Sequence, residues 1–398
     1  MIYLSGADVV LPDRVLGPAT IVIDGDRIVE IVAGARGASS GDTVVDLRQH
    51  IVVPGFIDVH VHGVEGSDTL DGGEAIRRIA SRLPRYGVTA FCPTSIACRP
   101  DALRAMLAEV SAARLAPERE ASRVLPAHLE SNFINPAFNG AQPIECLRLP
   151  PGASPPDSAA GEGFSGADIL HEIESAAADV GIVTLAPELD GAIDLVKRLV
   201  EAGHHVSLGH SGATYEEAQA GIEAGARQAT HLFNRMTPIG HRAPGLTGAV
   251  LEHEDVAVEL VCDGVHVHPG MMRVALAAKT PGRVMAITDG TAGAGLPAGT
   301  RTALGGRHIT VGDVARLDDG TIAGSVLTMD RAFGFLVTVC GLGLVEAATV
   351  SATTPARKLN LQGFGAISPG YVADLAVLDP SLRVTQTWLG GTRIWPLG

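Results

Sequence analysis

The middle of the chain alternates short apolar runs with longer segments whose apolar residues recur every three or four positions. One longer segment, residues 191–203, carries apolar residues at helical spacing: Ile193, Val196, Leu199 and Val200. The short runs are typical of strands and occupy residues 53–63, 88–95, 124–130, 181–188, 205–210, 228–234, 256–264 and 283–290. Repeated strand–helix units with apolar strands indicate a parallel sheet covered by helices. About eight strands in this order predict a (β/α)8 barrel over residues 52–362 rather than an open sheet.

Both ends of the chain are rich in β-strand patterns. Residues 19–34 contain two alternating runs joined by Asp24-Gly25, which is a strong hairpin signal. Residues 373–395 repeat the pattern with a Gly-Gly turn. We therefore expect one small β-sandwich domain built from residues 1–51 and 363–398. A segment rich in Pro, Gly and Ser, residues 148–165, predicts a loop within the barrel region.

Charge and cysteine content narrow the classes of partner. The formal net charge of −14 argues against nucleic acid and anionic membrane surfaces. A small anionic substrate stays compatible, because a pocket can be locally basic on an acidic protein. Five scattered cysteines without a CxxC pair suit neither a disulfide framework nor a thiolate zinc site. The first residues lack the pattern of a signal peptide, and no apolar window is long enough to span a bilayer. We expect a cytoplasmic protein.

Polar residues stand where the predicted strands end. His60 and His62 follow an apolar run two positions apart, so on a strand both side chains point to the same face. A lone histidine is more often a core residue than a ligand, but His210 and His231 end two further strands. In a barrel of this kind, functional side chains lie at the strand ends. Imidazoles together with a carboxylate such as Glu130 suit zinc, iron or another divalent metal.

Asp289 ends the last strong barrel strand, in the sequence AITDG. A carboxylate at that place can take a proton from water and pass it to a leaving group. The alternative is a helix N-cap or an Asx-turn, which is common for Asp before Gly. The histidines at the other strand ends favour the catalytic interpretation.

These motifs together resemble the amidohydrolase superfamily, and within it the N-acetylglucosamine-6-phosphate deacetylase family. The resemblance runs along nearly the whole chain: PGFIDVHVHG, HLES, LAPE, LGHSGATYEEA, ATHLFNRMTPIGHRAPG, CDGVHVHP, ITDGTAGAG and GAISPGYVADLAVLD. The combination of GHSGAT with THLFN is highly specific, whereas a lone HxH is not. The resemblance implies hydrolysis of the acetamido group of N-acetylglucosamine 6-phosphate to glucosamine 6-phosphate and acetate.

The resemblance also implies roles for individual residues. The main metal ligands fall on Glu130, His210 and His231, while His60 and His62 match a pair that supports a second metal in some members. One or two divalent ions are expected per subunit, zinc first and iron or another ion as alternatives. Asp289 matches the general acid/base. Substrate contacts are expected from Gln142, Asn234, Arg235, Arg242 and His266. Some members reach the sugar phosphate across a dimer interface at the position of Arg242, so the resemblance also implies a homodimer.

Three positions depart from the family pattern. Ser131 and Asn132 replace the usual Gly-Pro after the metal glutamate, which indicates a changed loop on the substrate side. Gln142 stands where many members have a histidine that polarises the amide carbonyl; Gln can donate a hydrogen bond there but carries no charge. Arg235 replaces an alanine, and either adds a phosphate contact, narrows the sugar pocket, or lies on the surface.

Two alternatives stay open. One is a deacetylase for a related amino sugar, either another epimer or an unphosphorylated sugar. The other is a barrel without catalytic activity that serves as a binding protein, against which the complete set Glu130, His210, His231 and Asp289 argues.

Overall fold

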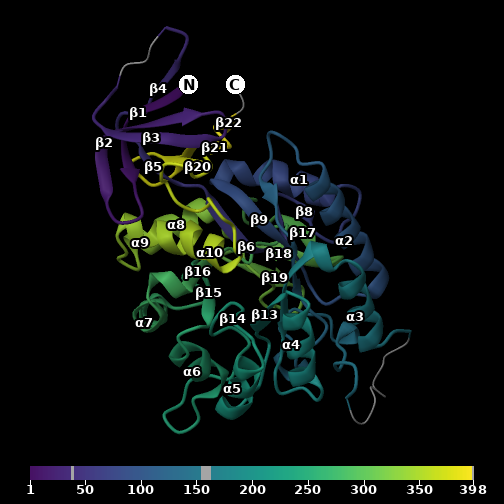
Figure 1. The fold of residues 1–398 in the computed structure, drawn as a ribbon. Coiled ribbons are helices and arrows are strands. Elements are labelled where there is room, and N and C mark those ends of the chain that lie inside the picture. Colours follow the sequence, from purple (N-terminus) through teal and green to yellow (C-terminus); the bar gives the residue numbers. More distant parts are fainter. Residues whose placement is uncertain (37–39, 154–162, 397–398) are drawn as a thin grey trace.

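The computed structural model describes residues 1–36, 40–153 and 163–396 (Figure 1). Its centre is a ring of parallel strands that follow one another in chain order. These strands are β6 (Phe56–Val61), β9 (Val88–Ser95), β11 (Ala127–Glu130), β12 (Val180–Leu185), β13 (His205–Leu208), β14 (Gln228–Ala229), β15 (Ala257–Val261) and β16 (Val284–Ile287). The ring closes where Val61 bridges Gly290 and the His62 amide donates to the Gly290 carbonyl at 2.8 Å. This arrangement confirms the predicted eight-stranded barrel. A short strand, β10 (Arg123–Val124), also pairs with β9.

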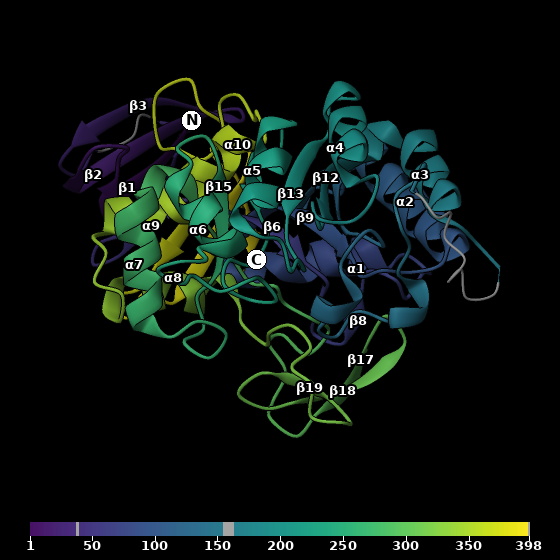
Figure 2. The ribbon, with the colours of Figure 1, turned by 90° about the horizontal axis from the view of Figure 1, so that it is seen from below.

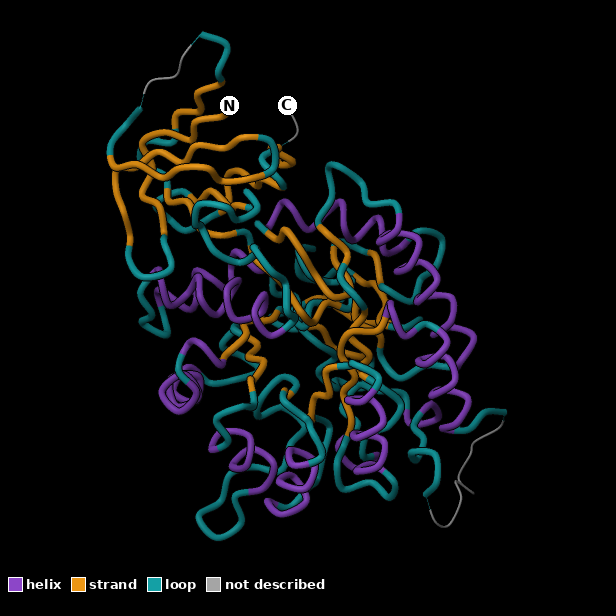
Figure 3. The backbone as a smooth tube through the Cα atoms, viewed as in Figure 1, coloured by secondary structure: helices purple, strands orange, loops and turns teal. Residues whose placement is uncertain are grey.

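Helices cover the outside of the ring, as Figure 3 shows. They are α1 (Ala75–Arg82), α2 (Pro100–Leu115), α3 (Gly166–Ser175), α4 (Ala192–Glu201), α5 (Tyr215–Glu223), α6 (Gly245–Glu252), α7 (Pro269–Lys279), α8 (Met329–Thr338), α9 (Leu344–Ala348) and α10 (Thr354–Lys358). The barrel strands are buried on both faces, between this helical layer and the barrel interior, which explains their continuous apolar runs.

The predicted helix at residues 191–203 is present as α4, with a buried face that differs from the predicted one. Val196 and Leu199 are buried as expected, together with Leu195, but Ile193 is half-buried and Val200 is 36% exposed. Val200 lies at the edge of the face, where a Cβ on Gly225 would meet its side chain at 3.1 Å. Of the predicted loop 148–165, residues 154–162 lie outside the described residues.

The two chain ends build one small β-rich domain, as predicted. In Figure 1 the N-terminal and C-terminal strands lie together, above the barrel. They form one eight-stranded sheet: β1 (Ile2–Val10), β2 (Val15–Asp24), β3 (Arg27–Ala33), β4 (Thr43–Asp46), β5 (Ile51–Pro54), β20 (Leu375–Leu378), β21 (Val384–Leu389) and β22 (Thr392–Trp395). The expected hairpin turns at Gly25 between β2 and β3. The division of the chain at residues 51 and 363 stays a prediction.

A third sheet lies inside the predicted barrel region and was not expected. It is antiparallel and consists of β17 (Arg301–Leu304), β18 (Arg307–Val311) and β19 (Ala315–Leu317), and Figure 2 shows it projecting from one end of the barrel. Its apolar residues form a separate small core with Ile96. A two-stranded ribbon, β7 (Gly63–Val64) and β8 (Ser67–Asp68), lies in the chain directly after β6. Among the described residues, no helix is long and apolar enough to cross a membrane.

Candidate active site

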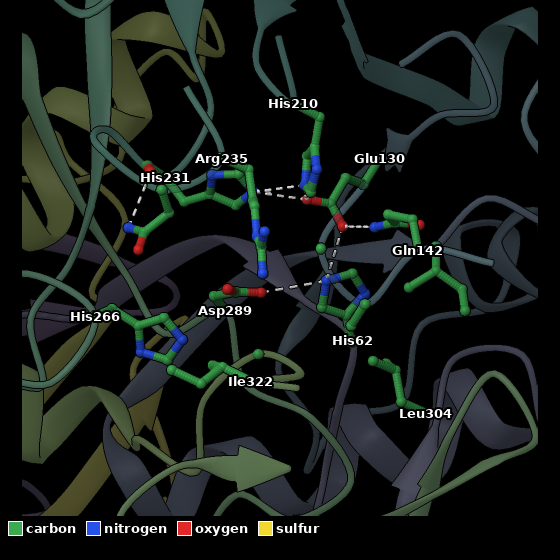
Figure 4. Close-up of a pocket in the computed structure, with 15 residues that line it drawn as sticks. His62, Glu130, Gln142, His210, His231, Arg235, His266, Asp289, Leu304 and Ile322 are labelled. Atoms are coloured by element: carbon green, nitrogen blue, oxygen red, sulfur yellow. Dashed lines mark hydrogen bonds and ion pairs between the residues drawn. The ribbon is translucent and has the colours of Figure 1, made fainter. Parts of the chain in front are cut away.

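The strand ends meet around a cavity of about 220 Å³ (Figure 4). Nine of the eleven residues expected at the site line it: His62, Glu130, Gln142, His210, His231, Asn234, Arg235, His266 and Asp289. His60 is fully buried directly behind His62. Arg242 is exposed and, in the described chain, does not line the cavity.

Glu130, His210 and His231 converge at the ends of three strands. Glu130 Oε1 lies 2.7 Å from His210 Nε2 and 2.8 Å from His231 Nε2. The two Nε2 atoms are themselves 3.0 Å apart. His210 Nδ1 lies 2.8 Å from the Phe138 carbonyl, to which it must donate, so Nε2 is the nitrogen that can offer a lone pair to a cation beside Glu130 and His231. Nitrogens and carboxylate oxygens gathered this closely fit a divalent cation.

A second group, His60, His62 and Asp289, lies beside the first. The two Nε2 atoms are 3.2 Å apart and lie 3.4 and 3.3 Å from Asp289 Oδ1. Glu130 faces both groups, because its other oxygen lies 3.5 Å from His62 Nε2. Burial lowers the pKa of His60, but the nearby carboxylates Glu259 and Asp289 outweigh burial and raise that pKa to about 10. The surrounding carboxylates thus favour positive charge here, as a metal site requires.

Asp289 is held by its backbone at the point where the barrel closes. Its amide donates to the His60 carbonyl at 3.0 Å, and its carbonyl accepts from the Ser325 amide at 2.8 Å. Gly324 permits this close approach, because a Cβ there would lie 2.9 Å from the Asp289 carbonyl oxygen. Burial raises the pKa of Asp289, but His60 and His62 outweigh burial and hold the pKa below its ordinary value. The Asp289 carboxylate is therefore held in its ionised form, which is the form that can accept a proton.

Several site residues have a left-handed backbone. The φ angles are +48° at His210, +29° at His231, +50° at Arg235 and +49° at Asp289. Such conformations cost of the order of 1–3 kcal/mol each in non-glycine residues and concentrate at functional sites. The strand ends turn sharply at these positions, so the side chains face the cavity.

Asn234, Arg235 and His266 also line the cavity. Arg235 extends into the cavity toward Asp289 in Figure 4, and its side chain lies over Gly140, where a Cβ would meet Nε at 3.1 Å. His266 Nδ1 pairs with Asp263 Oδ2 at 2.6 Å, while its buried Nε2 finds no hydrogen-bond partner among the described residues. Asn234 instead donates to the backbone carbonyl of His231 at 3.1 Å.

The departures from the family pattern make defined contacts. Gln142 Nε2 donates to Glu130 Oε2, and its Oε1 accepts from the Ala97 amide at 2.7 Å. Asn132 donates to the Cys98 and Cys146 carbonyls, both at 2.7 Å, and so joins two loops beside Gln142. These loops hold Gln142 against the metal-ligand candidate Glu130.

Sequence reasoning missed two kinds of site residue. Apolar residues complete the wall of the cavity: Ile96, Leu304 and Ile322. Glu259 lies beneath the cavity, fully buried on β15. An acidic residue within the apolar run VAVELVC was the available signal for Glu259.

The fold and site define a class of protein. The profile of the amidohydrolase family matches residues 51–394, and the chain belongs to this family. Its relatives include N-acetylgalactosamine-6-phosphate deacetylase from Escherichia coli O157:H7, 32% identical over 351 residues, which are 88% of this chain and 89% of the relative. N-acetylglucosamine-6-phosphate deacetylase from Bacillus subtilis (strain 168) is 32% identical over 85% of this chain and 83% of its own length.

Solved structures agree with this placement. A mutant of N-acetyl-D-glucosamine-6-phosphate deacetylase from Mycobacterium smegmatis, in complex with N-acetyl-D-glucosamine-6-phosphate, is similar with a TM-score of 0.87. It is 31% identical, and the match covers 99% of each chain. The resemblance inferred from the motifs is thereby confirmed.

Proposed function

We propose that the protein hydrolyses the acetamido group of N-acetylglucosamine 6-phosphate to glucosamine 6-phosphate and acetate. The single observation that carries this proposal is the cavity itself. The metal-ligand candidates Glu130, His210 and His231 line it together with Asp289, Arg235 and His266. Relatives that carry this deacetylase name match more than four fifths of the chain.

The metal centre is proposed to hold two divalent ions, zinc first. Glu130, His210 and His231 would hold one ion, and His60, His62 and Asp289 the other, with Glu130 facing both. A bound divalent metal polarises a carbonyl and lowers the pKa of water to about 7. His210→Ala should lose the first ion together with activity, whereas His60→Ala should lose only the second. Elemental analysis showing full occupancy in His210→Ala would contradict this assignment.

Proton transfer during hydrolysis is assigned to Asp289, and a hydrogen bond to the substrate is assigned to Gln142. The Asp289 carboxylate accepts a proton from a water molecule as the oxygen of that water attacks the acetamido carbon. The same carboxyl then gives that proton to the amide nitrogen as the carbon–nitrogen bond breaks, releasing acetate and the amine. Gln142 gives one N–H of its amide to Glu130, and its second N–H is available to the carbonyl oxygen of the substrate.

Phosphate recognition is proposed to rest on two side chains of the same cavity. Arg235 and the unpartnered His266 Nε2 supply donors from the same chain, and the Asn234 side chain shapes the loop between them. Arg242 lies outside the cavity of its own chain. It is proposed to contact the phosphate of a substrate that is bound in the cavity of the partner subunit in a homodimer. The cytoplasm is proposed as the compartment, and the five cysteines, which are all free and buried, suit it.

N-acetylgalactosamine 6-phosphate is the second candidate substrate. A relative named for that activity is 32% identical to this chain, the same level as relatives named for the glucosamine epimer. The two sugars differ at one hydroxyl, so the cavity has to distinguish a single stereocentre.

The deciding measurement is acetate release by zinc-loaded protein from phosphorylated and free N-acetylglucosamine and N-acetylgalactosamine. We expect the fastest turnover on N-acetylglucosamine 6-phosphate. Asp289→Asn should abolish kcat while substrate binding persists, because the carboxylate that accepts and returns the proton is lost. Faster turnover of the galactosamine epimer selects the second candidate. Binding of a sugar phosphate by the native protein without acetate release on any substrate would favour the binding-protein alternative.

A further inference from the structure

Glu259 is a fully buried carboxylate that lies beneath both candidate metal groups. It belongs to β15 and is 0% exposed, so substrate in the cavity cannot touch it. Burying a carboxylate is costly unless hydrogen bonds compensate its charge. The contacts of Glu259 therefore indicate what it is retained for.

Three donors from the barrel interior converge on this carboxylate. Glu259 Oε2 lies 2.9 Å from His60 Nδ1 and accepts from the His231 amide at 3.2 Å. Its Oε1 accepts from Gln228 Nε2 at 2.6 Å. His60 and His231 belong to different candidate metal groups, so one carboxylate contacts a member of each.

The contact with Glu259 determines which nitrogen of the His60 ring carries a proton. A carboxylate paired with an imidazole nitrogen places the proton on that nitrogen, here Nδ1. When a cation replaces the proton on the other nitrogen, Nε2 directs its lone pair at the space beside His62 and Asp289, 3.2 and 3.4 Å away. The alternative tautomer would present an N–H to a cation.

His60, His128 and Glu259 also lie close together, but the contacts of His128 argue against a third metal site there. His128 Nδ1 lies 2.9 Å from the Val59 carbonyl, to which it must donate, and Nε2 lies 2.8 Å from the Thr184 hydroxyl. Both of its nitrogens are thus engaged, and its distance of 3.8 Å from Glu259 Oε1 is too long for a hydrogen bond.

We propose that Glu259 is a positioning residue for the metal centre, which fixes the tautomer and orientation of His60 and the backbone turn at His231. The inference rests on the metal site of the proposed function, but not on its substrate. Partners that orient a ligand in this way typically contribute about 10–100-fold to metal affinity.

The test is zinc binding by the metal-free full chain, measured in competition with a chromophoric chelator and by elemental analysis. Glu259→Met removes both carboxylate oxygens, and we expect it to lower the zinc affinity of the site that contains His60 by about 10–100-fold. Glu259→Gln keeps one acceptor oxygen and should restore part of that affinity. Glu172→Gln is the matched control, because Glu172 is a buried carboxylate that pairs with Arg104 away from the cavity. This control should bind zinc like the native protein.

A combined variant separates positioning from a general effect on folding. If Glu259 acts through His60, adding Glu259→Gln to His60→Ala should cause no further loss at the second site. Native zinc affinity in both Glu259 variants would overturn the proposal, as would a lower melting temperature of the metal-free protein with unchanged zinc affinity. A native protein that binds no zinc would overturn the metal site as well. Native zinc binding without deacetylation would instead count against the proposed substrate alone.

Discussion

Arg235 is the one Lys or Arg among the described residues that line the cavity, and its guanidinium extends into it (Figure 4). A guanidinium suits a phosphate far better than a neutral hydroxyl because it donates two parallel hydrogen bonds. We expect Arg235→Ala to raise KM for the phosphorylated sugar by about 10-fold or more. An unphosphorylated analogue should be unaffected, and steady-state kinetics on the two sugars provides the measurement.

The same comparison distinguishes the other interpretation of Arg235. If Arg235 only narrows the sugar pocket, its truncation changes KM for both sugars in the same direction. Arg235→Lys is the matched variant, since it keeps the charge but not the planar fork. An equal effect of Arg235→Ala on both substrates would contradict the phosphate contact.

At the level of single residues, motifs with fixed spacing located most of the site. His60 and His62 share a strand face, and Glu130, His210, His231 and Asp289 end strands that meet at one rim of the barrel. Arg242 could not be placed from sequence, because its loop leaves the cavity and only the fold shows the direction. Glu259 was missed because its contacts join strands distant in the chain.

At the level of elements, helix α6 ends against a buried cation from helix α7. Lys279 is 1% exposed and donates to the carbonyls of Val250, at 2.8 Å, and His253. The last carbonyls of a helix lack partners within it, so Lys279 caps α6. We expect Lys279→Met to lower the free energy of unfolding by about 1–3 kcal/mol, because these buried acceptors lose their donor.

Chemical denaturation measures this change, with Lys197→Met as the control. Lys197 is exposed on α4 and pairs with Asp194 in the adjacent turn, so its removal should have little effect. Equal stability of the two variants would show that Lys279 does not cap α6 in solution.

The elements also show where pattern analysis was incomplete. The hairpin at Gly25 was predicted from its Asp-Gly turn, yet the hairpin of β17 and β18 turns on Gly305-Gly306 with the same kind of signal. It was overlooked because it interrupts the strand–helix alternation that defined the barrel. This insertion matters for the site, since Leu304 lines the cavity and Arg307 Nη1 donates to the Ala141 carbonyl at 2.8 Å.

At the level of the whole molecule, the apolar runs were sufficient to predict the barrel because each strand is buried on both faces. That the two chain ends form one domain could be predicted only from the β-strand patterns that both ends share. Its physical basis is the antiparallel pairing of β5 with β20, a contact between residues more than 300 positions apart. The assembly of subunits leaves no such pattern in the sequence.

A complementation experiment tests the proposed homodimer together with the role of Arg242. Asp289→Asn inactivates the site of its own subunit, whereas Arg242→Ala should weaken phosphate binding in the site of its partner. A mixed dimer of these two variants has one site with both an intact Asp289 and an intact Arg242 from the other subunit. Co-expression with two affinity tags should therefore restore deacetylation at low substrate concentration. Pairing Asp289→Asn with Arg235→Ala should restore nothing, because Arg235 acts within its own chain. Sedimentation of the native protein as a monomer, or equal activity of both mixed dimers, would contradict a phosphate contact across the interface.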